Sequence, residues 1–198
     1  MMKDISHLFL RLFALVLFCS TLTGHAIADP LADAQQAYAS GNYIKAFKLY
    51  MPLARQGDAQ AQLSVGVMYY IGQSVTQSHK EAAKWFTYAG RQGNALAQNI
   101  MGEMHDQGLG VPQDYSTAAK WYRLSAEQGN AKGQYNLGIM HERELGVPQD
   151  YVLAYMWLLL AKAPTETLSS VARHMTNEQI SQAKELANQC RVNEFKDC

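Results

Sequence analysis

The sequence predicts an all-α protein: a right-handed α/α superhelix of about four helix-pair repeats, followed by a C-terminal helical cap. Three observations support this fold class. Glycines and tryptophans recur every 36 residues, and the apolar residues between them follow the spacing of buried helical faces. The recurring series are Gly57, Gly93 and Gly129; Gly66, Gly102 and Gly138; and Trp85, Trp121 and Trp157. A period of this length is typical of solenoids.

Each interval reads as two helices. In the third interval we expect the first helix at about residues 95–106 and the second at about residues 115–128. The second carries apolar residues at the i, i+3, i+4, i+8 spacing of a buried face. These residues are Ala118, Trp121, Tyr122 and Ala126. "QGN" then closes the interval, with Gly129 placed to adopt a left-handed conformation.

The segment "GVPQDY" occurs at residues 110–115 and again at 146–151. It could be a ligand loop used twice or a connection between helices. Pro112 cannot continue a helix, and Asp114 can cap the next one. A phosphate-binding loop would need a preceding strand and a Lys-Ser/Thr pair, and the sequence shows neither. The segment therefore predicts an inter-helix loop.

Three glycines fall inside the expected first helices: Gly66, Gly102 and Gly138. A glycine there costs about 1 kcal/mol relative to alanine. We expect each to allow close approach of the paired helix, with the recurring tryptophans packing nearby.

Residues 1–28 predict a secretory signal peptide. Lys3 and Arg11 precede a short apolar run, and Ala26-Ile27-Ala28 has the form of a cleavage site. The run is short for a membrane span, which needs about 20 apolar residues. An uncleaved anchor is the alternative. We expect cleavage after Ala28, no membrane span afterwards, and a periplasmic or secreted location.

Charge and cysteine content limit the class of partner. The chain has 17 basic and 17 acidic residues, and we find no basic stripe in it, so nucleic acid is not expected. Beyond the signal peptide only Cys190 and Cys198 remain. An exported chain can join such a pair in a disulfide; two free thiols are the alternative. We expect a monomer.

The repeats resemble the Sel1-like repeat family, a relative of the tetratricopeptide repeat, and the resemblance implies an exported bacterial member. The third unit reads "ALAQNIMGEMHDQGLGVPQDYSTAAKWYRLSAEQGN", and the fourth begins "AKGQYNLGIMHERELGVPQDY". The resemblance covers residues 31–163, in units 31–58, 59–94, 95–130 and 131–163. Residues 164–198 follow as a helical cap and tail, where Thr176 and Gln179 predict a capping box. His105 and His141 depart from the family by standing where Tyr69 shows its tyrosine.

In such a superhelix the first helices build a concave face. Twelve residues are expected to line it, four from each of three units, and their chemistry differs between units while the packing positions repeat. They are Gln60, Leu63, Val67, Tyr70, Leu96, Asn99, Glu103, Asp106, Lys132, Tyr135, Ile139 and Glu142. A solvated face without a partner is the alternative.

The expected function is that of an exported, non-enzymatic scaffold or adaptor, which binds a protein or peptide segment, or a cell-envelope component, in its concave groove. The alternative is a cell-wall-linked enzyme or peptidoglycan-fragment binder that uses Glu103 and Glu142. No nucleophile–base pair supports catalysis, and no cofactor is expected. We considered His105, Asp106 and His141 with these carboxylates as metal ligands. The two histidines occupy packing positions, so we expect no metal.

Overall fold

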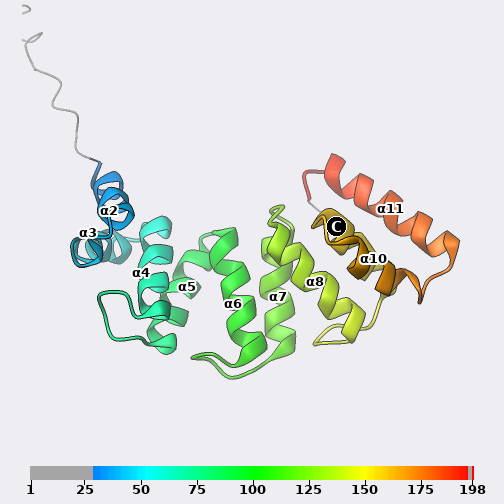
Figure 1. Cartoon of the computed structure of the whole chain (residues 1–198), viewed down its shortest axis with the longest axis horizontal. Helices are drawn as coiled ribbons and strands as arrows, with labels where there is room; N and C mark the ends of the chain where they lie inside the picture. Colours follow the sequence, from blue (N-terminus) through cyan, green and yellow to red (C-terminus); the bar gives the residue numbers. More distant parts are fainter. Residues whose placement is uncertain (1–28, 196–197) are drawn as a thin grey trace, which may run out of the picture.

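The computed structural model describes residues 29–195 and residue 198. The predicted signal peptide, residues 1–28, lies outside this part of the chain. The described part is all-helical, as predicted, and its ten helices follow one another in pairs along a curved array (Figure 1). They are α2 (Pro30–Ala39), α3 (Tyr43–Arg55), α4 (Ala59–Ile71), α5 (His79–Arg91), α6 (Ala95–Gln107), α7 (Tyr115–Ala126), α8 (Ala131–Arg143), α9 (Tyr151–Leu160), α10 (Thr165–Ala172) and α11 (Asn177–Val192).

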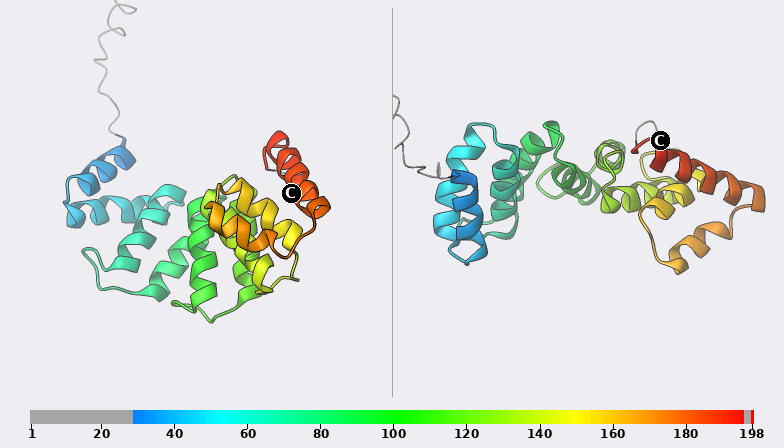
Figure 2. Two further views of the ribbon diagram at one scale, coloured as in Figure 1. Left: turned by 45° about the vertical axis from the view of Figure 1, so that its right-hand side comes forward. Right: turned by 90° about the horizontal axis from the view of Figure 1, so that it is seen from above.

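Helices pack mainly against their neighbours in the chain. The first helices of the repeats are α2, α4, α6 and α8, and the second helices are α3, α5, α7 and α9. Every first helix contacts the second helix of its own unit, and each second helix contacts the next first helix. In addition, α6 contacts α8 directly. The two ends of the described array lie far apart, with α2 at one end and α11 at the other (Figures 1 and 2).

The second helices of units two to four begin at side-chain caps. Ser78, Asp114 and Asp150 each accept a hydrogen bond from the backbone N–H three residues later. Such a cap satisfies one of the free N–H groups at a helix start. For Asp114, hydrogen bonds from the hydroxyl and backbone of Thr117 hold the pKa of the carboxyl below its ordinary value.

The "GVPQDY" loops also supply hydrogen-bond donors to the carbonyl groups at the end of the preceding helix. Gln113 donates from Nε2 to the carbonyl of Asp106 at 2.7 Å, and Gln149 donates to that of Glu142 at 2.9 Å. The helix-terminal carbonyls would otherwise lack partners. The repeated segment thus serves both helices that it joins.

The loop needs a glycine at this point because it packs closely against the backbone of the preceding unit. A Cβ on Gly110 would overlap the backbone of His79, and one on Gly146 would overlap that of Tyr115. In the second unit Ser74 takes this place with φ of 60°, and its Oγ donates to the carbonyl of Tyr43 at 3.1 Å. The loops therefore join successive units.

The glycines inside the first helices do allow close helix approach. A Cβ on Gly102 would lie 2.5 Å from the ring of Tyr122, and one on Gly66 would lie 2.6 Å from that of Phe86. A Cβ on Gly138 would lie 2.8 Å from Leu158. The expectation that tryptophans make these contacts is wrong: in each unit the contact comes from the residue after the tryptophan. Consecutive residues point about 100° apart around a helix, so the tryptophan faces elsewhere.

The tryptophans instead face the preceding unit. Cζ3 of Trp121 lies 3.1 Å from the position that a Cβ on Gly90 would take. Trp85 belongs to the apolar cluster that contains Ala54 of the unit before it. The same periodic residue thus joins one repeat to the previous one.

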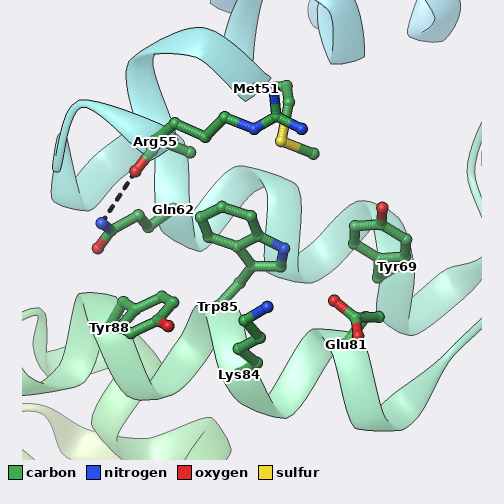
Figure 3. A pocket seen from close by; sticks show the side chains of 9 residues that line it. Met51, Arg55, Gln62, Tyr69, Glu81, Lys84, Trp85 and Tyr88 are labelled. Atoms are coloured by element: carbon green, nitrogen blue, oxygen red, sulfur yellow. Dashed lines mark hydrogen bonds between the residues drawn. The ribbon is translucent and has the colours of Figure 1, made fainter.

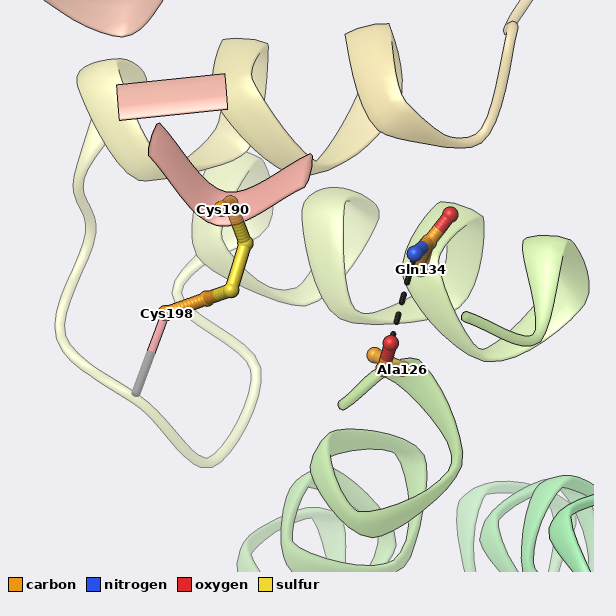
Figure 4. The surroundings of a disulfide bond; sticks show 4 residues. All are labelled: Ala126, Gln134, Cys190 and Cys198. Carbon is orange, nitrogen blue, oxygen red and sulfur yellow. Dashed lines mark hydrogen bonds between the residues drawn. A yellow bond between two sulfur atoms is a disulfide. The ribbon is translucent and has the colours of Figure 1, made fainter. Parts of the chain in front are cut away.

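The C-terminal segment, expected as a helical cap and tail, forms two helices, α10 and α11. Thr176 and Gln179 form the predicted capping box at the start of α11, which packs against α9. Cys190 and Cys198 are joined in a disulfide (Figure 4). Disulfides are typical of proteins that mature outside the cytoplasm. In the described residues, no helix is both long and apolar enough to span a bilayer.

Candidate functional site

We define the first-helix face as the surface formed by α2, α4, α6 and α8. The twelve predicted residues lie four each on α4, α6 and α8. Ten are exposed or half-buried, but Leu63 and Asn99 are buried, at 6% and 1% exposed. Asn99 does not lie open to a partner as predicted, because it is buried and its amide is hydrogen-bonded to Asn136 and Glu103.

The N-terminal part of this face holds a cavity of about 170 Å³. It is lined by residues of α2, α3 and α4: Tyr38, Tyr50, Gln60, Leu63, Ser64 and Val67. Although buried, Leu63 forms part of the wall. Burial raises the pKa of Tyr38 and of Tyr50, so both phenols keep their proton at neutral pH. The cavity is apolar, with neutral hydroxyl groups.

A second cavity of about 330 Å³ lies at the C-terminal part of the face. It is lined by residues of α6 and α8 and by the residue that follows α9: Glu103, Ala131, Lys132, Tyr135, Asn136 and Ala161. It offers one charge of each sign and a phenol, and so it suits a polar ligand group.

A hydrogen-bonded chain crosses between α8 and α6 beside this cavity. Asn136 donates from Nδ2 to Oδ1 of Asn99 at 3.1 Å, and Asn99 donates from Nδ2 to Oε1 of Glu103 at 2.8 Å. This chain holds the Glu103 carboxylate in place. Asn136 was not predicted as part of this face, because the 36-residue register aligns Asn99 with Tyr135 and not with Asn136.

Acidic groups gather on α6. Burial raises the pKa of Asp106 above its ordinary value. Burial also raises the pKa of Tyr122, and the nearby Asp106 and Glu103 raise it further, so Tyr122 keeps its proton. This part of the first-helix face therefore favours basic groups.

The two histidines anchor loops. Nδ1 of His105 lies 3.3 Å from the carbonyl of Pro112, and Nδ1 of His141 lies 3.3 Å from that of Pro148, so Nδ1 must be the protonated nitrogen in both contacts. Burial lowers the pKa of His141. Across the described residues, no three His, Cys, Asp or Glu side chains are grouped to hold a metal ion.

A larger cavity, of about 510 Å³, lies away from the predicted residues. We call it the α3–α5 groove, because it lies between these two second helices over α4 (Figure 3). It is lined by Met51, Ala54, Arg55, Gln62, Tyr69, Glu81, Lys84, Trp85 and Tyr88. The sequence reasoning missed this site.

Basic residues recur on the second helices with the repeat period. Lys48, Lys84 and Lys120 are 36 residues apart, as are Arg55 and Arg91, and all five are exposed. This series was not expected, since the sequence predicted no basic stripe. The glycine register could have revealed this series.

The arrangement of helix pairs matches a known repeat. The Sel1 repeat profile matches residues 32–58, 59–94, 95–130 and 131–163. The chain belongs to the Sel1 repeat family. It is a Sel1 repeat scaffold with four repeats followed by C-terminal helices.

Two solved structures resemble this Sel1 repeat protein. One is c5321, a protective antigen present in uropathogenic Escherichia coli strains, with 33% identity and a TM-score of 0.67 over 76% of this chain. The chain spans only 34% of the length of that antigen. The other is a Sel1 repeat protein from Oxalobacter formigenes, with 21% identity, a TM-score of 0.69, and 83% and 77% of the two chains covered; it supports the fold alone. No curated protein matches the chain by sequence.

Proposed function

We propose that this Sel1 repeat protein is an exported scaffold that binds a segment of a protein partner along its first-helix face. The observation that carries the proposal is the pair of chemically different cavities on one repeated framework. The cavity at α2–α4 is apolar with phenol hydroxyls, whereas the cavity at α6–α8 carries Glu103 and Lys132.

Equivalent positions in successive repeats carry different chemistry. Val67, Glu103 and Ile139 share one repeat position. The residues that pack the helices, such as the glycines facing Phe86 and Tyr122, stay nearly the same. A constant backbone with varied side chains suits recognition of one particular sequence, because each unit presents its own contact.

The cavities suggest the chemistry of the segment. An apolar side chain suits the cavity at Leu63 and Val67, and basic groups suit the acidic stretch at Glu103 and Asp106. Preformed cavities favour binding with little backbone rearrangement.

Export is part of the proposal. The predicted signal peptide and the disulfide between Cys190 and Cys198 both support a location outside the cytoplasm.

Photo-crosslinking in intact cells tests the proposal. A photoreactive amino acid placed at Val67 or Tyr135 should give a discrete adduct with the same protein. The same amino acid at Lys120, on a second helix, is the control and should give none. Adducts of equal pattern from all three sites would contradict the proposal. So would turnover of peptidoglycan fragments by the purified protein, which would indicate an enzyme.

A further inference from the structure

The α3–α5 groove is a second candidate binding surface, separate from the first-helix face. Trp85 lies at its centre and is only 9% exposed, and Arg55 and Lys84 lie on either side of the indole (Figure 3). Tyr88, 42% exposed, stands edge-on to Trp85 with the ring centroids 5.8 Å apart. The groove thus offers an aromatic floor between two cations, and its lining also includes the Glu81 carboxylate, which leaves one positive charge in excess.

Near the C-terminus, the surface equivalent to the α3–α5 groove is covered by a helix of the same chain, α11. Two repeat periods later, the positions of Ala54, Lys84, Trp85 and Tyr88 are held by Ala126, Met156, Trp157 and Leu160. Those four residues form one buried apolar cluster with residues of α11. The buried residues that α11 contributes are Ala183, Ala187 and Cys190. Their i, i+4, i+7 spacing is one face of a helix.

Phe195, three residues after the end of α11, covers a further part of this surface. A Cβ on Gly129 would lie 2.9 Å from the ring of Phe195. At the equivalent Gly57, beside the α3–α5 groove, a Cβ would meet nothing within 4 Å. The surface that Phe195 covers at Gly129 of the third repeat is open at Gly57 of the first.

The two grooves share their backbone framework. Gln62 donates to the carbonyl of Ala54 in the α3–α5 groove, and Gln134 donates to that of Ala126 beside the C-terminal disulfide (Figures 3 and 4). The junction between repeats that lies beside α11 is therefore built in the same way at the α3–α5 groove.

The charges differ between the two ends. Arg55 and Lys84 of the open groove correspond to Glu127 and Met156 where α11 lies. We infer that the α3–α5 groove binds an amphipathic helix of a partner protein. This helix has a stripe of small residues toward Trp85, carboxylates toward Arg55 and Lys84, and an aromatic residue just after its end. The stripe of small residues and the aromatic residue are inferred from α11 and Phe195, which occupy the equivalent groove. The carboxylates are expected because they would pair with Arg55 and Lys84.

Peptides built on the chain's own C-terminus test this inference. The parent probe is a fluorescein-labelled peptide of residues 177–198 with Cys190→Ala and Cys198→Ala. The acidic probe adds Lys184→Glu and Arg191→Glu, which place carboxylates beside the small stripe. Fluorescence anisotropy with the full chain should show the acidic probe binding at least about tenfold more tightly than the parent. An acidic probe with Ala187→Trp should lose binding, because the bulky ring cannot approach Trp85.

Paired charge reversals locate the site. Arg55→Glu with Lys84→Glu should weaken binding of the acidic probe at least about tenfold. Arg91→Glu with Lys120→Glu makes the same change one repeat later and should leave binding within about twofold. All four residues are exposed, so circular dichroism should show both variants folded. The inference is overturned if neither probe binds, if both bind equally, or if the two charge-reversed proteins behave alike. Concentration-dependent dimers that the Arg55→Glu, Lys84→Glu variant abolishes would also overturn it, because the occupant would then be a second copy of the chain.

Discussion

The side chain of Gln98 donates a hydrogen bond from Nε2 to the backbone carbonyl of Gly90 at 2.9 Å, and so ties the start of α6 to the end of α5. The same bond recurs from Gln62 to Ala54 and from Gln134 to Ala126. Gln128 completes the unit by donating to Oε1 of Gln98 at 2.6 Å. This repeated amide bond links each of the four repeats to the next.

Replacing Gln98 with alanine should destabilise the array. The side chain is buried, and its loss leaves the carbonyl of Gly90 without this partner, which costs about 1–3 kcal/mol. Urea unfolding followed by circular dichroism measures the change. Gln128→Ala is the matched control: its exposed side chain should cost less. Equal losses in the two variants would count against the structural role given to Gln98.

Gly102→Ala should also destabilise the protein, although alanine is the better helix former by about 1 kcal/mol. The new Cβ would meet the buried ring of Tyr122 at 2.5 Å. Overpacking of this kind costs about 1–3 kcal/mol, so the clash outweighs the propensity gain. Adding Tyr122→Leu should remove part of the penalty, and a double-mutant cycle in urea measures the coupling. A stabilised Gly102→Ala variant would show that α6 and α7 can separate freely.

Glu144→Gly should stabilise the protein. Glu144 ends α8 with φ of 57°, whereas Gly72 and Gly108 end the equivalent helices at 72° and 70°. A left-handed conformation costs a residue with a Cβ about 1–2 kcal/mol, partly offset by the greater freedom of glycine in the unfolded chain. Thermal unfolding should show a higher midpoint for Glu144→Gly and a lower one for Gly108→Ala. A lower midpoint for Glu144→Gly would mean that the carboxylate contributes more than the strain costs.

His141 should make stability depend on pH. Because burial lowers the pKa of His141 in the folded protein, the unfolded chain takes up this proton first as the pH falls below about 6.5. Stability contributed by the neutral imidazole is thus present above that pH and is lost as the pH falls toward the folded pKa. Urea unfolding at several pH values should show a smaller loss for His141→Tyr, which restores the residue type found at Tyr69. An unchanged pH dependence would contradict this assignment.

Much of the fold was predictable because the same residues recur at the same spacing in several repeats. Gly129 or Trp121 alone says little, but a shared 36-residue register fixes helix pairs, caps and loops together. Asp114 and Thr176 cap helices as predicted, because capping depends on residues within one turn. Contacts between helices were harder to predict. The error over the tryptophans arose because a shift of one residue turns a side chain by about 100°.

The candidate sites were only partly predictable. The register placed twelve residues on the first helices. It could not show that Asn99 is buried and accepts a hydrogen bond from Asn136. The α3–α5 groove depends on the packing of three helices from two repeats. Its basic residues are spread over the chain and gather only once the helices stack.

In the proposed function, the varied residues of the first-helix face bind the partner, while the repeated loops only support the fold. The affinity of the crosslinked partner for two purified variants distinguishes these two roles. Tyr70→Ala, Glu103→Gln and Tyr135→Ala together should weaken binding at least about 100-fold, since a few central residues dominate most interfaces. Gln113→Ala with Gln149→Ala, in the two "GVPQDY" loops, should leave the affinity within about twofold. Full affinity in the first variant and lost affinity in a folded second variant would contradict the proposed function.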